Sequence, residues 1–193
     1  MSGSAAGSAA WIQTAFGLVL LAVAGHCGAR LVQASRAAAG LDAVRHAADL
    51  LMALGLAAML WPPGDPISPL AGEVAFGLVV ALSLVGALSA GEAGRRVAWV
   101  RLAVGGAAML YMFAAMSGGA FGPLTLVLIA YFACFAAASA LATTRGLASA
   151  VVRVTPATGP ARALPAVVLG PPAVSLCHSV MAIVTVYLLL AMR

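Results

Sequence analysis

The sequence predicts an all-α fold, a polytopic transmembrane bundle of six helices with the N-terminus and the C-terminus outside. Of the 193 residues, 64% are hydrophobic and only 8% are charged. Soluble domains are roughly 45–50% apolar and about 25% charged, so this chain has too few polar side chains to cover a soluble core. Soluble enzymes and nucleic-acid-binding proteins are therefore excluded as classes, and a lipid bilayer is the expected environment.

Six apolar runs are long enough to cross a membrane. A hydrocarbon core about 30 Å thick requires roughly 20 apolar residues in a helix. The expected spans cover residues 9–33, 43–61, 68–90, 97–117, 122–143 and 171–192. Together, residues 1–193 are expected to form a single integral membrane domain, with residues 144–170 as a flexible cytoplasmic loop.

Three of these runs need a separate argument. At the start of the first run, residues 1–10 carry no positively charged side chain, which is unlike a secretory signal peptide, so we expect this run to stay as a membrane span. The second is the shortest and starts with the polar residues Arg45, His46 and Asp49. The sixth begins at Pro171 and Pro172, where the first helical turn needs no N–H donors.

The arginines predict the orientation of the chain. All ten basic residues are arginine, and nine of them fall in or beside the first, third and fifth connections: Arg30, Arg36, Arg45, Arg95, Arg96, Arg101, Arg145, Arg153 and Arg162. Cytoplasmic loops of membrane proteins carry an excess of positive charge. The odd-numbered connections are therefore expected to be cytoplasmic, in a bacterial plasma membrane.

Three histidines on three different spans are the most informative polar residues. Each is fifteen residues from an outer boundary residue, in the pairs Trp11 and His26, His46 and Trp61, and His178 and Arg193. At 1.5 Å per residue, the counting places each of them roughly 22 Å below the outer surface. We therefore expect the three imidazoles to share one level in the inner leaflet.

Soft and acidic side chains surround this layer in the sequence. Cys177 and Met181 share a helix flank with His178, while Asp49 and Met52 follow His46 at intervals of three residues. Imidazole, thiolate and thioether groups together suit copper, in particular Cu(I), and His with Asp or Cys also suits zinc. The predicted metal ligands are His26, His46, Asp49, Met52, Cys177, His178 and Met181.

Two structural interpretations compete with this one. Met109, Met112 and Met116 form a stripe on the fourth span, and methionines at such spacing more often fill gaps between helices than bind a ligand. The glycines and alanines of the spans favour close approach of helix backbones in lipid. Asp49, if it is not a ligand, is expected to pair with His46, His26 or Arg30.

Other functions remain open. Two histidines from different spans could ligate one haem b, which would make the protein a membrane electron carrier. A structural or assembly subunit of a membrane complex, or a homo-oligomer, would need no ligand. The chain has no H-E-x-x-H, P-loop or G-x-G-x-x-G motif, and we expect it not to be an enzyme.

The spacing of histidine and methionine also resembles a known family. The residues that carry the resemblance are His46, Asp49, Met52 and Met59, the stripe Met109, Met112 and Met116, and the pair His178 and Met181. In this respect the chain is similar to the actinobacterial multi-pass membrane proteins of the domain of unknown function 5134 family, over most of its length. The resemblance implies a plasma-membrane protein and metal handling, although the fourth span here has no histidine among its methionines.

Overall fold

The computed structural model describes residues 3–37, 40–60, 68–116, 122–153 and 171–191, and within these ranges it contains six helices and no strand. The helices are α1 (Gly3–Arg36), α2 (Gly40–Leu60), α3 (Pro69–Ser89), α4 (Ala93–Met116), α5 (Gly122–Arg153) and α7 (Pro171–Ala191). Each is long and apolar enough to cross a membrane. The predicted all-α bundle with six spans is confirmed, whereas the placement of both termini outside stays a prediction.

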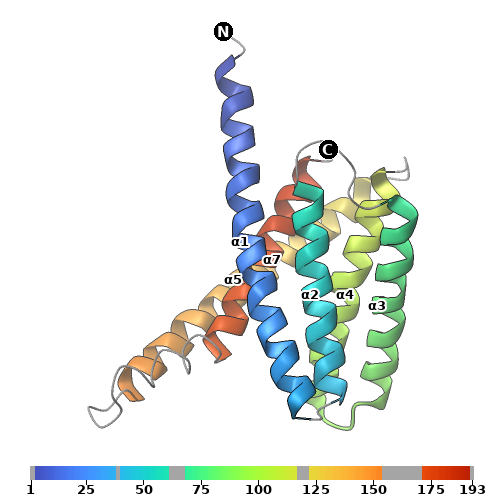
Figure 1. The fold of residues 1–193 in the computed structure, drawn as a ribbon, viewed down its shortest axis with the longest axis vertical. Helices are drawn as coiled ribbons and strands as arrows, with labels where there is room; N and C mark the ends of the chain where they lie inside the picture. Colours follow the sequence, from blue (N-terminus) through green and yellow to red (C-terminus); the bar gives the residue numbers. More distant parts are fainter. Residues whose placement is uncertain (1–2, 38–39, 61–67, 117–121, 154–170, 192–193) are drawn as a thin grey trace. The chain divides into compact units, whose positions relative to one another are not determined.

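The chain divides into two compact units, Met1–Gly122 and Pro123–Arg193. The single membrane domain expected for residues 1–193 therefore stays a prediction, and each unit is described by itself. The first unit consists of α1, α2, α3 and α4 (Figure 1). The second contains α5 from Pro123 onward, together with α7.

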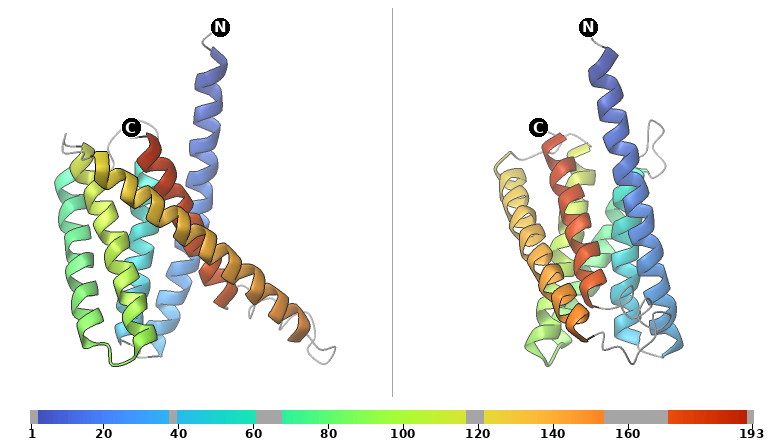
Figure 2. Two further views of the ribbon diagram at one scale, coloured as in Figure 1. Left: turned by 180° about the vertical axis from the view of Figure 1, so that it is seen from behind. Right: turned by 90° about the vertical axis from the view of Figure 1, so that its left-hand side faces the viewer.

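Two helical hairpins build the first unit. Helix α1 packs against α2, and α3 packs against α4, and both pairs stay side by side when the view is turned (Figure 2). Helix α2 also contacts α4 and α3, which joins the hairpins. The connection from α1 to α2 and the connection from α3 to α4 lie at the same end of this unit (Figure 1), as expected for two odd-numbered connections.

Glycines let these helices approach one another closely. A Cβ atom at Gly86 of α3 would lie 2.5 Å from the indole of Trp99, and one at Gly72 would lie 2.5 Å from the ring of Phe113 on α4. The ring centroids of Phe113 and Phe76 are 5.7 Å apart and nearly parallel. Close packing of this kind drives helix association where the lipid offers no hydrophobic gain.

Helices α2 and α4 interlock through two methionine and glycine contacts. Met52 of α2 fills the space above Gly105 of α4, where a Cβ atom would lie 2.9 Å from its sulfur. Met109 of α4 fills the space above Gly55 of α2, where a Cβ atom would lie 2.8 Å from its terminal methyl group. The flexible thioether chains therefore serve as packing elements at this interface.

The outer surface of α3 is apolar, as a lipid-facing surface should be. Its exposed large side chains recur along the helix at Leu70, Val74, Leu78, Leu82, Val85 and Leu88. Several serines and threonines of the described helices donate their hydroxyl groups to carbonyls of their own helix. Ser83, for example, is fully buried and donates to the carbonyl of Val79 at 2.6 Å. Such back-bonding removes the need for a water partner in lipid.

One sequence expectation needs correction. Helix α5 continues to Arg153, so residues 144–153 of the predicted flexible loop are helical, and residues 154–170 lie outside the described residues. No proline interrupts the chain between Pro123 and Arg153, and its many alanines favour helix.

Candidate functional site

A buried polar group lies in the hairpin of α1 and α2. His46 and Asp49 of α2 are 7% and 8% exposed, and Cys27 of α1 is 6% exposed. His26 and Arg30 of α1 are half-buried. Ionisable side chains within a membrane span are rare and costly, and they normally face the interior of a bundle and mark a functional position.

The Nε2 atom of His26 is buried and has no hydrogen-bond partner among the described residues. A buried polar atom without a partner costs about 1–3 kcal/mol. Such an atom in a native protein calls for an explanation, for which a bound ion or water is the usual one. Of the predicted ligands, His26 is therefore the one whose surroundings most clearly call for a further partner.

His26 and His46 are offset along the hairpin. Helices α1 and α2 meet at one end of the hairpin, where α1 finishes at Arg36 and α2 starts at Gly40. His26 is ten residues from that end, and His46 is six, so the two lie about 6 Å apart along the axis at 1.5 Å per residue. This offset is counted along the helices, and the common depth of the three histidines in the membrane stays a prediction.

Arg30 stands in the same region as both imidazoles. It follows His26 by one helical turn and is six residues from the end of the hairpin, which is the level of His46. The positive charge of Arg30 acts on His26 and on His46, while Asp49 acts on His46 with the opposite sign. A guanidinium beside two imidazoles opposes the binding of a highly charged cation.

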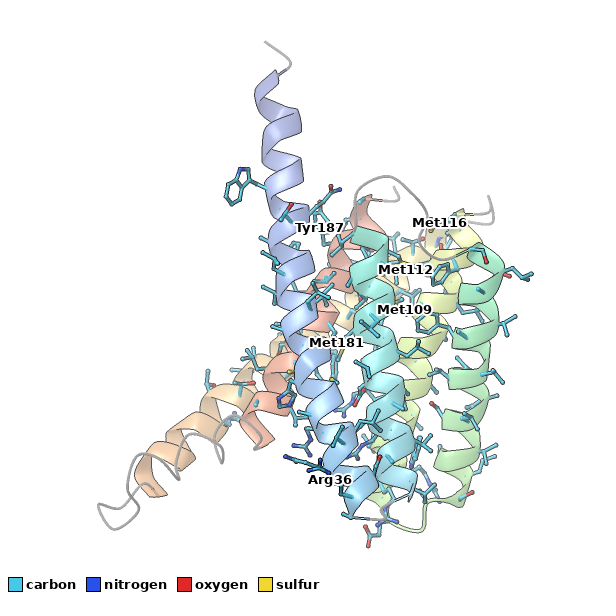
Figure 3. All side chains as sticks on the ribbon, in the orientation of Figure 1. Arg36, Met109, Met112, Met116, Met181 and Tyr187 are labelled. Atoms are coloured by element: carbon cyan, nitrogen blue, oxygen red, sulfur yellow. The ribbon has the colours of Figure 1, made fainter. Side chains whose placement is uncertain are left out.

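The methionines lie mainly in packing positions. Met109, Met112 and Met116 follow one another along α4 (Figure 3). Met109 and Met112 are 2% and 0% exposed, whereas Met116 near the end of the helix is 53% exposed. The sulfur of Met52 faces Gly105, so packing against α4 explains the position of this predicted ligand.

The remaining predicted ligands belong to the second unit. Cys177 and His178 of α7 are half-buried, and Met181 (Figure 3) is buried. The imidazole of His178 packs edge-on against the ring of Phe135 on α5, with centroids 6.4 Å apart. Phe135 in turn stacks on Tyr131 at 6.3 Å. This aromatic row orients His178, and the sequence pattern gave no signal for it.

Within the described residues, no group of three or more His, Cys, Asp or Glu side chains is arranged to hold a metal ion. The closed, four-ligand type of structural zinc site is therefore not formed by either unit alone. The described part of the chain offers a narrower candidate, the imidazole of His26 on α1 together with the buried His46 on the neighbouring helix α2.

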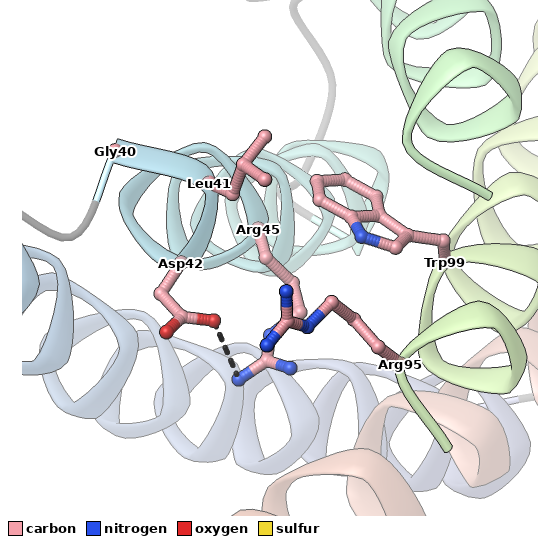
Figure 4. Close-up of a pocket in the computed structure, with 6 residues that line it drawn as sticks. All are labelled: Gly40, Leu41, Asp42, Arg45, Arg95 and Trp99. Carbon is pink, nitrogen blue, oxygen red and sulfur yellow. Dashed lines mark ion pairs between the residues drawn. The ribbon is translucent and has the colours of Figure 1, made fainter. Parts of the chain in front are cut away.

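Basic residues at one end of the first unit line a cavity of about 290 Å³. Its lining residues are Gly40, Leu41, Asp42, Arg45, Arg95 and Trp99 (Figure 4). From the sequence, the two arginines predicted only the orientation of the chain in the membrane. The sequence did contain a signal for this cavity. The first and the third connection are both basic, and the positive-inside rule places both on the same side of the membrane.

The chain matches a family model. The model described as "Domain of unknown function (DUF5134)" matches residues 41–192, which extend from the second residue of α2 to just past the end of α7. No curated protein and no solved structure matches the chain.

Proposed function

Because the chain belongs to the family described as Domain of unknown function (DUF5134) and is a multi-pass membrane protein, we propose a function from its own residues: it binds a transition metal ion, with Cu(I) as the preferred ion, at His26 and His46. The observation that carries the proposal is the buried Nε2 atom of His26, which has no hydrogen-bond partner among the described residues. Imidazole nitrogen is a good ligand for copper, and coordination would replace the missing hydrogen bond.

The charges around the pair favour a monovalent ion. The guanidinium of Arg30 acts on both imidazoles and opposes a cation. At His46, Arg45 adds to this effect, and Asp49 and Asp42 compensate for part of it. Coulomb energy scales with the charge of the ion, so Arg30 opposes Zn(II) or Cu(II) about twice as strongly as Cu(I). Cu(I) also accepts few ligands, which suits a hairpin that offers two histidines.

Cys177, His178 and Met181 of α7 remain predicted ligands from the second unit. They are tested separately, so that a loss of metal can be assigned to one unit. The triple variant Cys177→Ser, His178→Ala and Met181→Leu removes their donor atoms, and the double variant His26→Ala and His46→Ala removes those of the hairpin.

The test is a Cu(I) titration of the purified protein in detergent, against a chelator of known affinity under anaerobic conditions. We expect the wild type to take one Cu(I) per chain and the hairpin double variant to lose this binding. A control variant, Gln13→Ala at an exposed position of α1, should bind as the wild type does. Unchanged copper binding in the double variant would overturn the proposal.

The same preparation distinguishes the alternative functions. A Soret band in its visible spectrum, lost in the double variant, would assign the histidines to haem b and contradict the copper proposal. Protein that takes up neither copper nor haem would favour a structural or assembly role in a membrane complex.

A further inference from the structure

The cavity at the end of the first unit brings two cationic side chains together from different helices. Arg45 comes from the second turn of α2, and Arg95 comes from the first turn of α4 (Figure 4). Both line the same space of about 290 Å³. Two guanidinium groups facing one small cavity repel each other, and an anion between them would relieve this repulsion.

The carboxylates near these arginines compensate for them only weakly. Asp42 lies 3.7 Å from Arg45 and Glu92 lies 3.8 Å from Arg95, each as a neighbour three residues away on the chain. The Asp42 and Glu92 side chains are 61% and 79% exposed, and exposed ion pairs of this kind contribute little. Of the two carboxylates, only Asp42 lines the cavity.

The backbone adds to the positive character of the cavity. Gly40 and Leu41 are the first residues of α2, and both line the space. The first N–H groups of a helix have no partner within it and carry the positive end of its dipole. A Cβ atom at Gly40 would meet nothing within 4 Å, so the approach to this backbone is open.

The cavity also has an apolar side. Leu41 and the indole of Trp99 line it beside the two arginines, and Trp99 is itself part of the buried core formed with Leu102 and Ala87. An apolar wall next to a cationic one suits a ligand that carries a phosphate group on a hydrocarbon body. The position at the ends of two membrane-spanning helices suits the headgroup level of a bilayer.

We propose that the cavity lined by Arg45, Arg95 and Trp99 binds a phosphate group, supplied by the headgroup of an anionic phospholipid. The planar guanidinium groups of arginine match phosphate oxygens with paired N–H donors. The volume accommodates the phosphate and the adjoining part of the headgroup, while the acyl chains stay in the bilayer along α2 and α4. This binding is independent of the copper proposal, because it uses none of the same residues.

Trp99 supplies the readout for the test. The chain has three tryptophans, so the double variant Trp11→Phe and Trp61→Phe leaves Trp99 as the sole indole fluorophore. Full-length protein in a neutral detergent is titrated with dihexanoyl phosphatidylglycerol, with dihexanoyl phosphatidylcholine and with inorganic phosphate. We expect saturable fluorescence changes with the anionic lipid, and binding at least tenfold weaker with the other two.

Charge-removing variants locate the binding. Arg45→Gln with Arg95→Gln should weaken phosphatidylglycerol binding at least tenfold, because each substitution removes charge-assisted hydrogen bonds. The matched control, Arg36→Gln with Arg145→Gln, removes the same charge at exposed positions and should change binding less than twofold. Arg45→Lys with Arg95→Lys, which keeps the charge, should retain an intermediate affinity if the fold is intact.

Three results would overturn the proposal. Equal weakening by the two glutamine pairs would mean that the lipid responds only to surface charge. Saturable binding of inorganic phosphate as tight as that of phosphatidylglycerol would exclude the lipid as the specific source of the phosphate. No fluorescence response to any of the three probes would mean that the cavity binds no phosphate group.

Discussion

His26 is the residue on which the proposed binding of Cu(I) depends. Its buried Nε2 atom has no hydrogen-bond partner in the part of the chain that the structure describes, and such an atom destabilises the metal-free protein. His26→Phe replaces the polar ring with an apolar one of similar shape. We expect this substitution to raise the free energy of unfolding of the metal-free protein by about 1–2 kcal/mol, so that the variant unfolds at a higher temperature than the wild type. We also expect it to lose Cu(I) binding.

Thermal unfolding of the metal-free protein in detergent measures the first effect. Adding Cu(I) should then raise the midpoint of the wild type and leave that of His26→Phe unchanged, because only a ligand that binds the folded state stabilises it. A His26→Phe variant that is less stable than the wild type without metal would show that the imidazole already has a partner.

The methionines of α4 give a second prediction for single residues. Met109→Ala opens a cavity next to Gly55 and should destabilise the protein by about 2–4 kcal/mol. Met116→Ala removes a side chain that is 53% exposed and should change stability by less than about 0.5 kcal/mol. The copper content should be the same in both variants. A loss of copper in Met109→Ala would instead indicate that Met109 is a copper ligand.

The sequence predicted single residues unevenly. Of the residues that the sequence pattern singled out on α2, the structure buries His46 and Asp49 but leaves Met52 and Met59 half-buried. The two polar residues were predictable because ionisable residues within spans are few and costly. It could not reveal the missing partner of His26 Nε2, which depends on what α2 places opposite α1. The common depth of the three histidines stays a prediction, because the offset of about 6 Å between His26 and His46 is counted along the hairpin and not across the bilayer.

At the scale of helices, close packing at glycine determines how α3 and α4 pair. Gly86→Ala would place a methyl carbon within 2.5–2.8 Å of the Trp99 indole. Overpacking of this kind costs typically 1–3 kcal/mol. We expect Gly86→Ala to lower the unfolding midpoint in a detergent or denaturant titration by a corresponding amount.

Gly77 provides the matched control on the same helix. A Cβ atom there would meet nothing within 4 Å, so Gly77→Ala should be neutral, or stabilising by up to about 1 kcal/mol through the higher helix propensity of alanine. Equal destabilisation by the two substitutions would contradict the packing of α3 on α4 described here.

Helix positions were predictable because the apolar runs are long and breakers separate them. Ser68 shows how local chemistry starts a span, since its hydroxyl accepts from the N–H of Ala71 at 3.3 Å and Pro69 follows at the first helical position. The sequence could not predict which glycines lie at helix contacts. A Cβ atom at Gly55 or Gly86 would meet an aromatic ring, whereas one at Gly17 or Gly25 would meet nothing within 4 Å. The difference depends on the side chains of the partner helix.

At the scale of the whole molecule, the arginines predict which side of the membrane each connection occupies. The connections of α1 to α2 and of α3 to α4 lie at the same end of the first unit. Reporter domains inserted after residues 38 and 91 should therefore both report the cytoplasm, and one after residue 64 should report the outside. A reporter after residue 38 that proved to be outside would contradict the orientation.

The proposed binding of Cu(I) by the imidazoles of the α1–α2 hairpin can be observed at the metal itself. X-ray absorption at the copper edge is measured on the whole protein loaded with one Cu(I) per chain. We expect a first coordination shell of nitrogen from two imidazoles, which is lost in His26→Ala. A shell dominated by sulfur that disappears in Cys177→Ser, or a spectrum unchanged by His26→Ala, would contradict it.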